Sequence, residues 1–204
     1  MNYPSKLIED AVMAFSSLPG IGKKTALRLV LHLLKQEGGY TEQIAHALQK
    51  MRREIKQCSI CNNISDGVHC NICLDKGRDS HTICVVESIR DVMAIEDTGQ
   101  YKGGYHILGG VISPIEGIGP EDIDIAGLMK RVQEGEVKEL VMAISPTIDG
   151  DTTIFFIGKQ LQGSDVKIST IARGISFGGE LEYADEMTLG RSIVARTPYR
   201  IQEE

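Results

Sequence analysis

The sequence predicts a multidomain protein that combines purely α-helical parts with an α/β part. Three observations support this fold class: apolar residues at helical spacing over residues 1–57, two C-x-x-C pairs over residues 58–73, and β-branched runs that alternate with helical patterns over residues 80–175. Alternating strands and helices are typical of a mainly parallel sheet with helices on both faces. We therefore expect a small helical module, a four-cysteine module, an α/β domain and a C-terminal segment, residues 176–204.

The charge of the chain is unevenly distributed. Its 204 residues carry a formal net charge of −6, which by itself argues against a nucleic-acid-binding protein. Residues 1–57 carry +4, however, and residues 58–204 carry −10. This asymmetry fits a basic module that binds a polyanion next to an acidic module with other partners, although solvated surfaces alone could also produce it.

The sequence shows no sign of a membrane span or of secretion. It lacks the run of about 18 apolar residues that a spanning helix needs. Its N-terminus lacks the basic region followed by an apolar core that marks a secretory signal. Five cysteines in such a chain indicate a reducing compartment and metal binding rather than disulfides, so we expect a cytoplasmic protein.

The N-terminal module predicts three helices. Ser5 can cap the first helix, Pro19 and Gly20 end it, and Gly22 precedes the second helix. The expected apolar face of the second helix comprises Ala26, Leu27, Val30, Leu31 and Leu34. Thr41 is expected to cap the third helix. The expected apolar face of the third helix comprises Ile44, Ala45, Leu48, Met51 and Ile55.

The turn between the first two helices has the signature of a helix-hairpin-helix motif. Free backbone N–H groups at a helix N-terminus favour an anion, which in this motif is usually a DNA phosphate. Three cations follow in the first turns of the second helix, where they oppose the helix dipole but can hold phosphate. The predicted DNA-binding residues are Gly20, Gly22, Lys23, Lys24 and Arg28. Such binding should be sequence-independent and salt-sensitive; the alternative is an ordinary turn with exposed lysines.

The four cysteines predict a metal site. Cys58, Cys61, Cys70 and Cys73 form two C-x-x-C pairs separated by eight residues, and four thiolates at this spacing can surround one Zn²⁺. We expect a C4 zinc finger with a structural role, because this segment has almost no apolar core of its own. The alternatives are two disulfides, four unrelated cysteines, or an iron-binding electron carrier, which would be coloured. Cys84 lies in a predicted buried strand and is expected to be a core residue.

The rest of the chain predicts an α/β domain. We expect strands at residues 81–86, 105–108, 139–144 and 166–170, and helices at about residues 90–95, 121–133 and 152–161. In parallel sheets, functional groups gather at the carboxyl ends of the strands. Glu87 ends one predicted strand, and Asp149 and Asp151 follow another as a D-x-D pair. These three carboxylates could converge on Mg²⁺, or they could merely cap helices, as Asp151 could do for the helix after it.

A strand-end glutamate with a later strand-end D-x-D resembles the Toprim domain of topoisomerases, primases and some nucleases. The order helix-hairpin-helix, C4 zinc finger, Toprim then resembles one family over essentially the whole chain, the bacterial recombination mediator proteins RecR. The stretches that carry this resemblance are Leu18-Pro19-Gly20-Ile21-Gly22, the four cysteines, residues 105–110, residues 117–122 and residues 178–191.

The resemblance implies a non-enzymatic DNA-binding protein of recombinational repair. Members of the family assemble as ring-shaped tetramers that encircle DNA, and they act with RecO and RecF to load the recombinase RecA onto single-stranded DNA. By motif, the DNA-contacting cations would be Lys24 and Arg28, and the C-terminal segment would take part in assembly. Glu87, Asp149 and Asp151 would be partner-contact residues rather than catalysts.

The acidic residues leave one alternative function open. Ser145 and the D-x-D pair depart from the family pattern, in which many relatives carry Asn and the longer Glu, and this puts Mg²⁺ binding in doubt. The chain could instead be a Mg²⁺-dependent Toprim nuclease or a topoisomerase-like enzyme. A topoisomerase also needs a positioned tyrosine nucleophile, and no tyrosine here lies in a recognisable motif of that kind.

Overall fold

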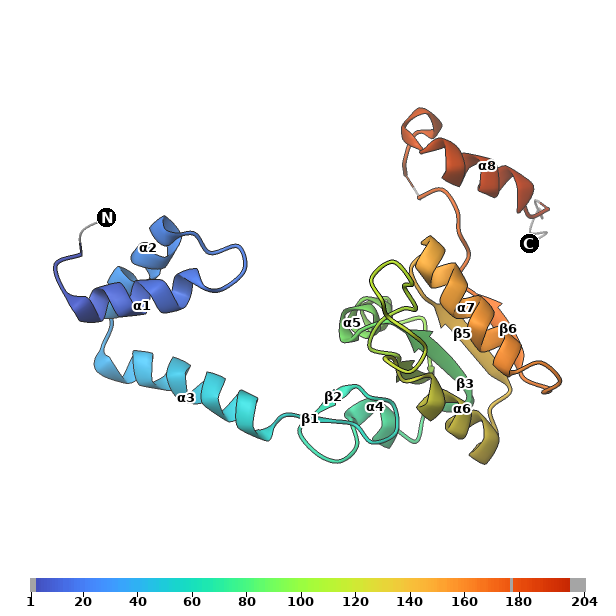
Figure 1. The fold of residues 1–204 in the computed structure, drawn as a ribbon, viewed down its shortest axis with the longest axis horizontal. Helices are drawn as coiled ribbons and strands as arrows, with labels where there is room; N and C mark the ends of the chain where they lie inside the picture. The colour runs from blue at the N-terminus through green and yellow to red at the C-terminus, as the bar shows by residue number, and fades with distance from the viewer. Residues whose placement is uncertain (1–2, 177, 199–204) are drawn as a thin grey trace, which may run out of the picture. The chain divides into compact units, whose positions relative to one another are not determined.

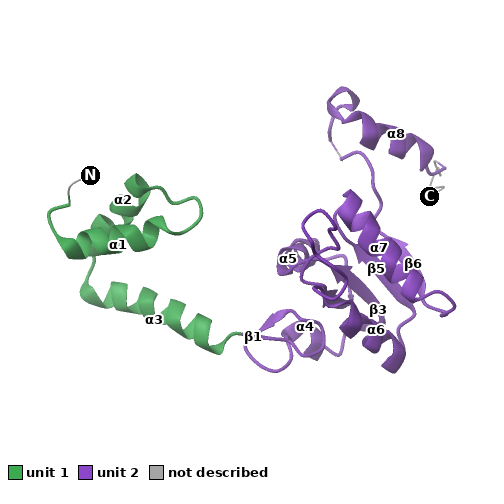
Figure 2. Ribbon diagram, in the orientation of Figure 1, with its two compact units in different colours: residues 1–55 green, residues 56–204 purple. Residues whose placement is uncertain are grey.

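The computed structural model describes residues 3–176 and 178–198. The chain divides into two compact units, Met1–Ile55 and Lys56–Glu204, which are coloured separately in Figure 2. The four-cysteine module therefore belongs to the same unit as the α/β domain. The C-terminal segment predicted for assembly is described only in part, because residues 177 and 199–204 lie outside the described residues.

The first unit contains three helices. They are α1 (Lys6–Ser16), α2 (Lys23–Leu34) and α3 (Gly38–Glu54). The hydroxyl of Ser5 accepts a hydrogen bond from the backbone N–H of Leu7 at 3.2 Å, which confirms the predicted cap. The expected start of α3 was wrong: Glu37 holds the N-cap position and Thr41 lies inside the helix. Gly38 and Gly39 are therefore the first two residues of the helix.

Only α1 and α2 share a buried core. Val12 packs against Ala26 and Val30, with partly buried apolar residues around them. Leu31 and Leu34, which were expected on the apolar face of α2, are exposed. The 17-residue helix α3 has no buried residue, although apolar residues recur along it. The predicted periodicity is therefore present, but the single chain does not bury the faces that it creates.

The second unit begins with the four-cysteine module. This module consists of β1 (Lys56–Gln57), β2 (Ile64–Ser65) and the short helix α4 (Asn71–Leu74). The two strands pair antiparallel. Its buried apolar cluster consists of Cys58, Cys61 and Cys70, with partly buried Ile72 and Cys73 packed against them. Asn63 and Ser65 are its buried polar residues. The module therefore has almost no apolar core, as its sequence predicts.

A parallel four-stranded sheet follows. Its strands are β3 (Asp79–Val86), β4 (Gly103–Ile107), β5 (Glu139–Ala143) and β6 (Lys167–Thr170). They lie in the order β4-β3-β5-β6, and every neighbouring pair is parallel. The crossovers carry α5 (Ile89–Asp97), α6 (Ile125–Glu134) and α7 (Ile148–Gln160). The mainly parallel sheet predicted from the strand and helix alternation is confirmed (Figure 1).

Helices cover both faces of this sheet. Ile83 on β3 packs in one cluster with Leu128 of α6 and Ile157 of α7. The next residue of the strand, Cys84, packs in a second cluster with Val92 of α5. Alternation of neighbouring side chains between two apolar layers is expected for a strand that is buried on both sides. Cys84 is thus a core residue, as predicted.

The C-terminal segment carries little buried surface. It forms a 3-10 turn (Leu181–Tyr183) and helix α8 (Glu186–Val194). Asp185 caps α8 by accepting a hydrogen bond from the backbone N–H of Thr188 at 2.9 Å. No described residue of α8 is buried, and Met187 and Val194 are largely exposed. Among the described residues, no helix combines the length and the apolar content needed to cross a membrane.

Candidate functional site

The hairpin before α2 is shaped by two glycines with different roles. Gly20 has φ of +76°, a left-handed conformation that side-chain-bearing residues rarely adopt. The turn is closed by the backbone N–H of Ile21, which donates to the carbonyl of Leu18 at 3.1 Å. Gly22 has an ordinary extended conformation and open space where a Cβ would stand. The turn therefore does not require glycine at position 22. The absence of a side chain there leaves the first backbone N–H groups of α2 accessible to a ligand.

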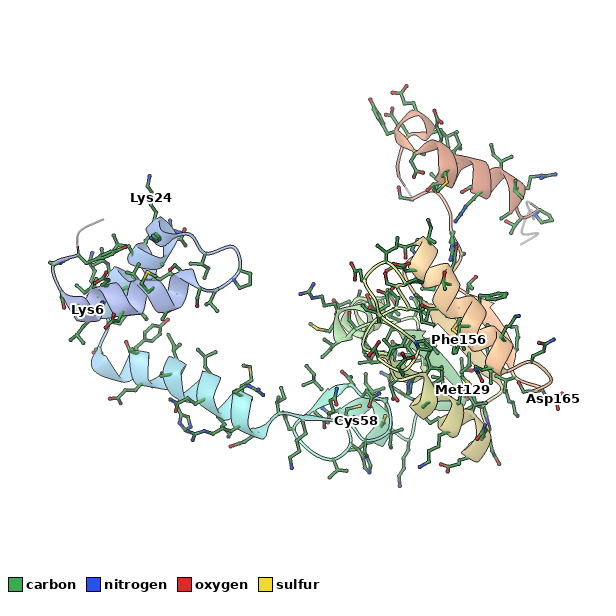
Figure 3. All side chains as sticks on the ribbon, viewed as in Figure 1. Lys6, Lys24, Cys58, Met129, Phe156 and Asp165 are labelled. Atoms are coloured by element: carbon green, nitrogen blue, oxygen red, sulfur yellow. The ribbon has the colours of Figure 1, made fainter. Side chains whose placement is uncertain are left out.

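The predicted cations lie at this helix start and face solvent. Lys23, Lys24 and Arg28 are all exposed, and Lys24 stands out from the first turn of α2 in Figure 3. Within the part of the chain that the structure describes, none of the three forms an ion pair. Two of them, Lys24 and Arg28, line a groove of about 440 Å³ together with Leu27, Leu31, His32 and Lys35. Unpaired cations beside open helix N–H groups form a suitable site for a phosphate.

The first pair of cysteines lies in a tight backbone turn. The backbone N–H of Cys58 donates to the carbonyl of Asn63 at 2.7 Å, and the N–H of Asn62 donates to the carbonyl of Cys58 at 3.0 Å. Asn62 has φ of +63°, which asparagine tolerates better than most residues. The second pair surrounds the first turn of α4, where the N–H of Leu74 donates to the carbonyl of Cys70 at 3.1 Å.

The four thiols converge and fit a zinc ion. One ligand atom from each of Cys58, Cys61, Cys70 and Cys73 lies within 4.8 Å of all the others, and the sulfurs of Cys61 and Cys70 are 3.5 Å apart. Four sulfurs at about 2.3 Å from zinc would be about 3.8 Å from one another in a tetrahedron, so a small adjustment completes the site. Cys84 is not part of this group.

The pKa shifts of the thiols differ within the cluster. Burial raises the pKa of the Cys58 thiol, but backbone hydrogen bonds to its sulfur outweigh burial and lower this pKa to about 6. Burial raises the pKa of the Cys84 thiol to about 12. Within the cluster, the pKa of Cys61 is raised chiefly by its hydrogen bond with Cys73, and the pKa of Cys70 is raised chiefly by burial. The thiol of Cys84 stays protonated in its apolar environment.

The zinc module is fixed to the edge of the sheet by residues that the sequence did not indicate. The backbone N–H of Ile107, on edge strand β4, donates to the carbonyl of Cys61 at 2.9 Å. The side-chain amide of Asn62 donates to the carbonyl of Ile107 at 3.2 Å and to the carboxylate of Asp124. Asp124 also caps α6 by accepting from the N–H of Gly127 at 3.0 Å. The positive φ of Asn62 aims its side chain at the sheet, and no sequence pattern marks this role.

The three predicted Toprim carboxylates do not form a metal site of this kind. Among the described residues, only the four cysteines have ligand atoms that all lie close enough together to hold a metal ion. The carboxylates of Glu87, Asp149 and Asp151 do not converge in this way. Glu87 accepts a hydrogen bond from the backbone N–H of Ser145 at 2.6 Å. Asp151 is bound by Arg173, whose Nη2 lies 2.5 Å from Oδ1. The residues present therefore do not fit the Mg²⁺ ion that the Toprim fold implies.

The helix that carries the D-x-D pair begins earlier than expected. Thr147 caps α7 by accepting a hydrogen bond from the backbone N–H of Gly150 at 3.0 Å. The expectation that Asp151 could be the cap was therefore wrong, and Asp149 and Asp151 both lie in the first turn of the helix. The helix dipole stabilises carboxylates at these positions without any metal.

Comparisons with known proteins assign each module to a family. A family model described as "RecR, helix-hairpin-helix" matches residues 8–52, and the model of the four-cysteine zinc finger domain of RecR matches residues 55–75. A model described as "Toprim domain" matches residues 81–172, and "RecR, C-terminal" matches residues 174–197.

Relatives named "Recombination protein RecR" match nearly the whole chain. The protein of Cytophaga hutchinsonii is 58% identical, with 100% of both chains covered. The protein of Flavobacterium johnsoniae is 60% identical over 98% of this chain and 97% of its own length. The protein of Parabacteroides distasonis is 57% identical over 98% of this chain and 96% of its own length. The chain therefore belongs to the recombination protein RecR family of recombinational repair.

Proposed function

We propose that this chain forms a ring-shaped tetramer that encircles DNA and acts with RecO and RecF to load RecA onto single-stranded DNA. Membership of the RecR family supports this role. The observation that carries the proposal is the start of α2, where Lys23, Lys24 and Arg28 are exposed beside open helix N–H groups. These groups contact phosphates and no bases, so binding is independent of sequence.

Assembly explains how an acidic chain holds DNA. With a net charge of −6, a single copy offers only one small basic hairpin. Each phosphate contact is weak and salt-sensitive, but a ring carries several hairpins at a high effective concentration around one duplex or strand. The retention of DNA then depends on the closed assembly more than on the affinity of any one hairpin.

Two helices supply apolar surface for self-association. Leu48 and Met51 of α3 are 58% and 53% exposed, and no residue of this helix is buried in the single chain. Met187 and Val194 of α8 are 69% and 82% exposed. Amphipathic helices whose apolar faces lack a partner within the chain are typical of interfaces between chains. A different interface at each end of the chain is what a tetramer built from pairs requires.

The acidic edge of the α/β domain serves as a partner surface, and the protein has no catalytic activity. Asp149 lies in the first turn of α7, near the carboxyl ends of the strands. A basic partner such as RecO would be steered to this edge by charge complementarity. A Mg²⁺-dependent nicking activity that disappears in Asp149→Asn would contradict the non-catalytic assignment. The protein acts in the cytoplasm, at the nucleoid.

The DNA-binding role is tested with a double substitution. We expect Lys24→Ala with Arg28→Ala to weaken binding to DNA at least about tenfold and to reduce its salt dependence, because each copy loses two phosphate contacts. Fluorescence anisotropy with labelled single-stranded and double-stranded DNA at several salt concentrations measures both effects. The charge-matched control is Lys130→Ala with Lys167→Ala, two exposed cations of the α/β domain. Equal DNA binding by the two folded double mutants would overturn the proposal.

The assembly is tested on α3. Leu48→Arg with Met51→Arg places two charges on its exposed apolar face, and we expect the tetramer to dissociate into smaller species without loss of helix content. Sedimentation velocity and circular dichroism measure these two outcomes. Gln43→Arg with Gln49→Arg adds the same charge at exposed positions of the same helix and should leave the assembly intact. A wild-type chain that stays monomeric with and without DNA would contradict the ring.

A further inference from the structure

An arginine lies where the Toprim fold would be expected to bind a divalent metal. Arg173 follows the end of β6 and reaches α7, where its Nη2 and Nη1 lie 2.5 and 3.3 Å from Oδ1 and Oδ2 of Asp151. Both carboxylate oxygens are therefore bound to a single guanidinium group. This planar, two-point contact is the geometry in which arginine binds a carboxylate best.

A second predicted metal ligand also has another partner. Glu87 follows the end of β3, and its Oε1 accepts a hydrogen bond from the backbone N–H of Ser145 at 2.6 Å. This contact joins the carboxyl ends of two neighbouring strands, β3 and β5. Asp149 lies in the first turn of α7, where the helix dipole favours its negative charge. The sources of positive potential at this edge thus include Arg173, a backbone N–H group, a helix terminus and the charge of Arg191, which also acts on Asp151.

A divalent metal would have to displace the arginine. Mg²⁺ demands nearly octahedral oxygen coordination and gives up its water reluctantly. The guanidinium group keeps its charge at every physiological pH. It also lowers the pKa of the Asp151 carboxyl from its ordinary value, chiefly through their hydrogen bonds. Replacing this ion pair by a partly hydrated Mg²⁺ ion, held by one or two carboxylates, would therefore gain little binding free energy.

We propose that Arg173 replaces the divalent metal at the acidic edge of the Toprim domain. The arginine neutralises Asp151, joins the segment after β6 to the start of α7, and makes this edge independent of Mg²⁺. A partner that docks here therefore meets Glu87 and Asp149 with their charges unscreened by metal. The inference concerns the edge alone and holds whether or not the protein is a DNA clamp.

The proposal predicts that metal binding appears when the arginine is removed. Mn²⁺ is the probe, because it takes the oxygen ligands of Mg²⁺ and free Mn²⁺ is counted by electron paramagnetic resonance. The full-length, zinc-loaded wild-type chain should show no saturable Mn²⁺ site at the acidic edge. Arg173→Ala should gain a saturable Mn²⁺ site, at least about tenfold tighter than any residual Mn²⁺ binding by the wild-type chain, and adding Asp151→Asn should abolish that gain.

Two further variants separate the arginine from general charge effects. Lys167→Ala removes a cation that lies 3.1 Å from Glu139, at the other end of β6, and should gain no Mn²⁺ site. Arg173→Gln keeps a polar side chain, although a shorter one with fewer donors, and removes its charge, so it tests the proposal if the alanine variant does not fold. The proposal is overturned if wild-type protein binds Mn²⁺ and loses it in Asp151→Asn. It is also overturned if neither folded Arg173 variant binds Mn²⁺ better than Lys167→Ala does.

Discussion

The cysteine cluster and the acidic edge are two predicted metal sites in one compact unit, and only the first is formed. Four sulfurs lie within 4.8 Å of one another in the cysteine cluster. At the acidic edge, Glu87 is bonded to a backbone N–H group and Asp151 to Arg173. Both sites contain suitable ligand types, so ligand type alone does not decide whether a metal binds.

The difference follows from how each site is built. Each pair of cysteines is held by one local backbone turn, such as the bond from the N–H of Asn62 to the carbonyl of Cys58. Local turns fix the direction of two ligands at a time, and among the described residues no cationic side chain forms an ion pair with the thiols. The carboxylates come from two elements far apart in the sequence. One carboxylate, that of Asp151, is already bound by the permanently charged guanidinium group of Arg173. A built-in counter-ion therefore changes a metal-site motif into an ordinary charged surface.

The largest expected effect concerns the cysteine cluster. Cys70→Ala removes one zinc ligand, and we expect loss of zinc and a fall of several kcal/mol in the free energy of unfolding, because zinc replaces the missing apolar core of this module. Zinc release to a chromogenic chelator and the thermal midpoint measure the two effects. This substitution should reduce stability or assembly before it weakens DNA contact by α2.

Cys84→Ala is the matched control for the zinc ligand. It also removes a buried thiol, but from the core of the sheet rather than from the cluster. This variant should keep its zinc and lose only the small packing contribution of one side chain, about 1–2 kcal/mol. A Cys70→Ala chain that is as stable as Cys84→Ala would show that zinc has no structural role.

An intermediate effect is expected where the zinc module meets the sheet. Asn62→Gly keeps the positive φ but removes the amide that bonds Ile107 and Asp124. We expect a loss of about 1–3 kcal/mol, because two partly buried acceptors lose their donor. Denaturant unfolding measures this change, and hydrogen exchange should show faster exchange at the end of β4.

Asn71→Gly provides the comparison for Asn62. It changes the same residue type in the second cysteine turn, at an exposed position that begins α4. Its cost should stay within about 1 kcal/mol, the usual penalty for glycine in a helix. Equal losses in the two variants would mean that the amide of Asn62 does not fix the module to the sheet.

The smallest effect is expected at the acidic edge and depends on pH. The pKa of Asp151 in the folded protein lies below its ordinary value of 3.8, so its ion pair stabilises the fold above that pH. This contribution is lost as the pH falls through the lowered pKa. Asp151→Asn should therefore lower the free energy of unfolding at pH 7 by less than about 1 kcal/mol, since the pair is partly exposed. Thermal unfolding measures this difference, which should vanish in strong acid.

Asp149→Asn separates the ion pair from the helix dipole. Both aspartates lie in the first turn of α7, but the guanidinium group of Arg173 binds Asp151. Asp149→Asn should show only the dipole contribution of about 0.3–1 kcal/mol at low salt. If the loss of unfolding free energy depends on pH in the same way in both variants, the contact of Asp151 with Arg173 contributes nothing to stability.

The features that could be predicted from the sequence depend on local residue patterns. The hairpin, the zinc ligands and the parallel sheet each depend on spacing within a short stretch, such as the glycine turn before Lys23. The unpredicted features join distant residues: Asn62 and Ile107 are 45 positions apart, and Asp151 and Arg173 are 22 apart. The start of α7 was misplaced because Thr147 and Asp151 are both good caps, and the N-cap of the helix is Thr147.

The exposed apolar helices show a second limit. The periodicity of α3 predicts a helix with one apolar face, and the helix is present. The periodicity alone does not determine what covers that face. Leu48 thus lies on the predicted face of α3 and is exposed in the single chain.

Counting metals on the wild-type protein tests the central contrast most directly. The full-length chain is brought to equilibrium by dialysis against zinc-free buffer that contains Mn²⁺, and both metals are measured on each side of the membrane. We predict one zinc per chain, held by the cysteine cluster, and no manganese above its free concentration. A bound manganese that disappears in Asp151→Asn, or a folded chain without zinc, would contradict this account.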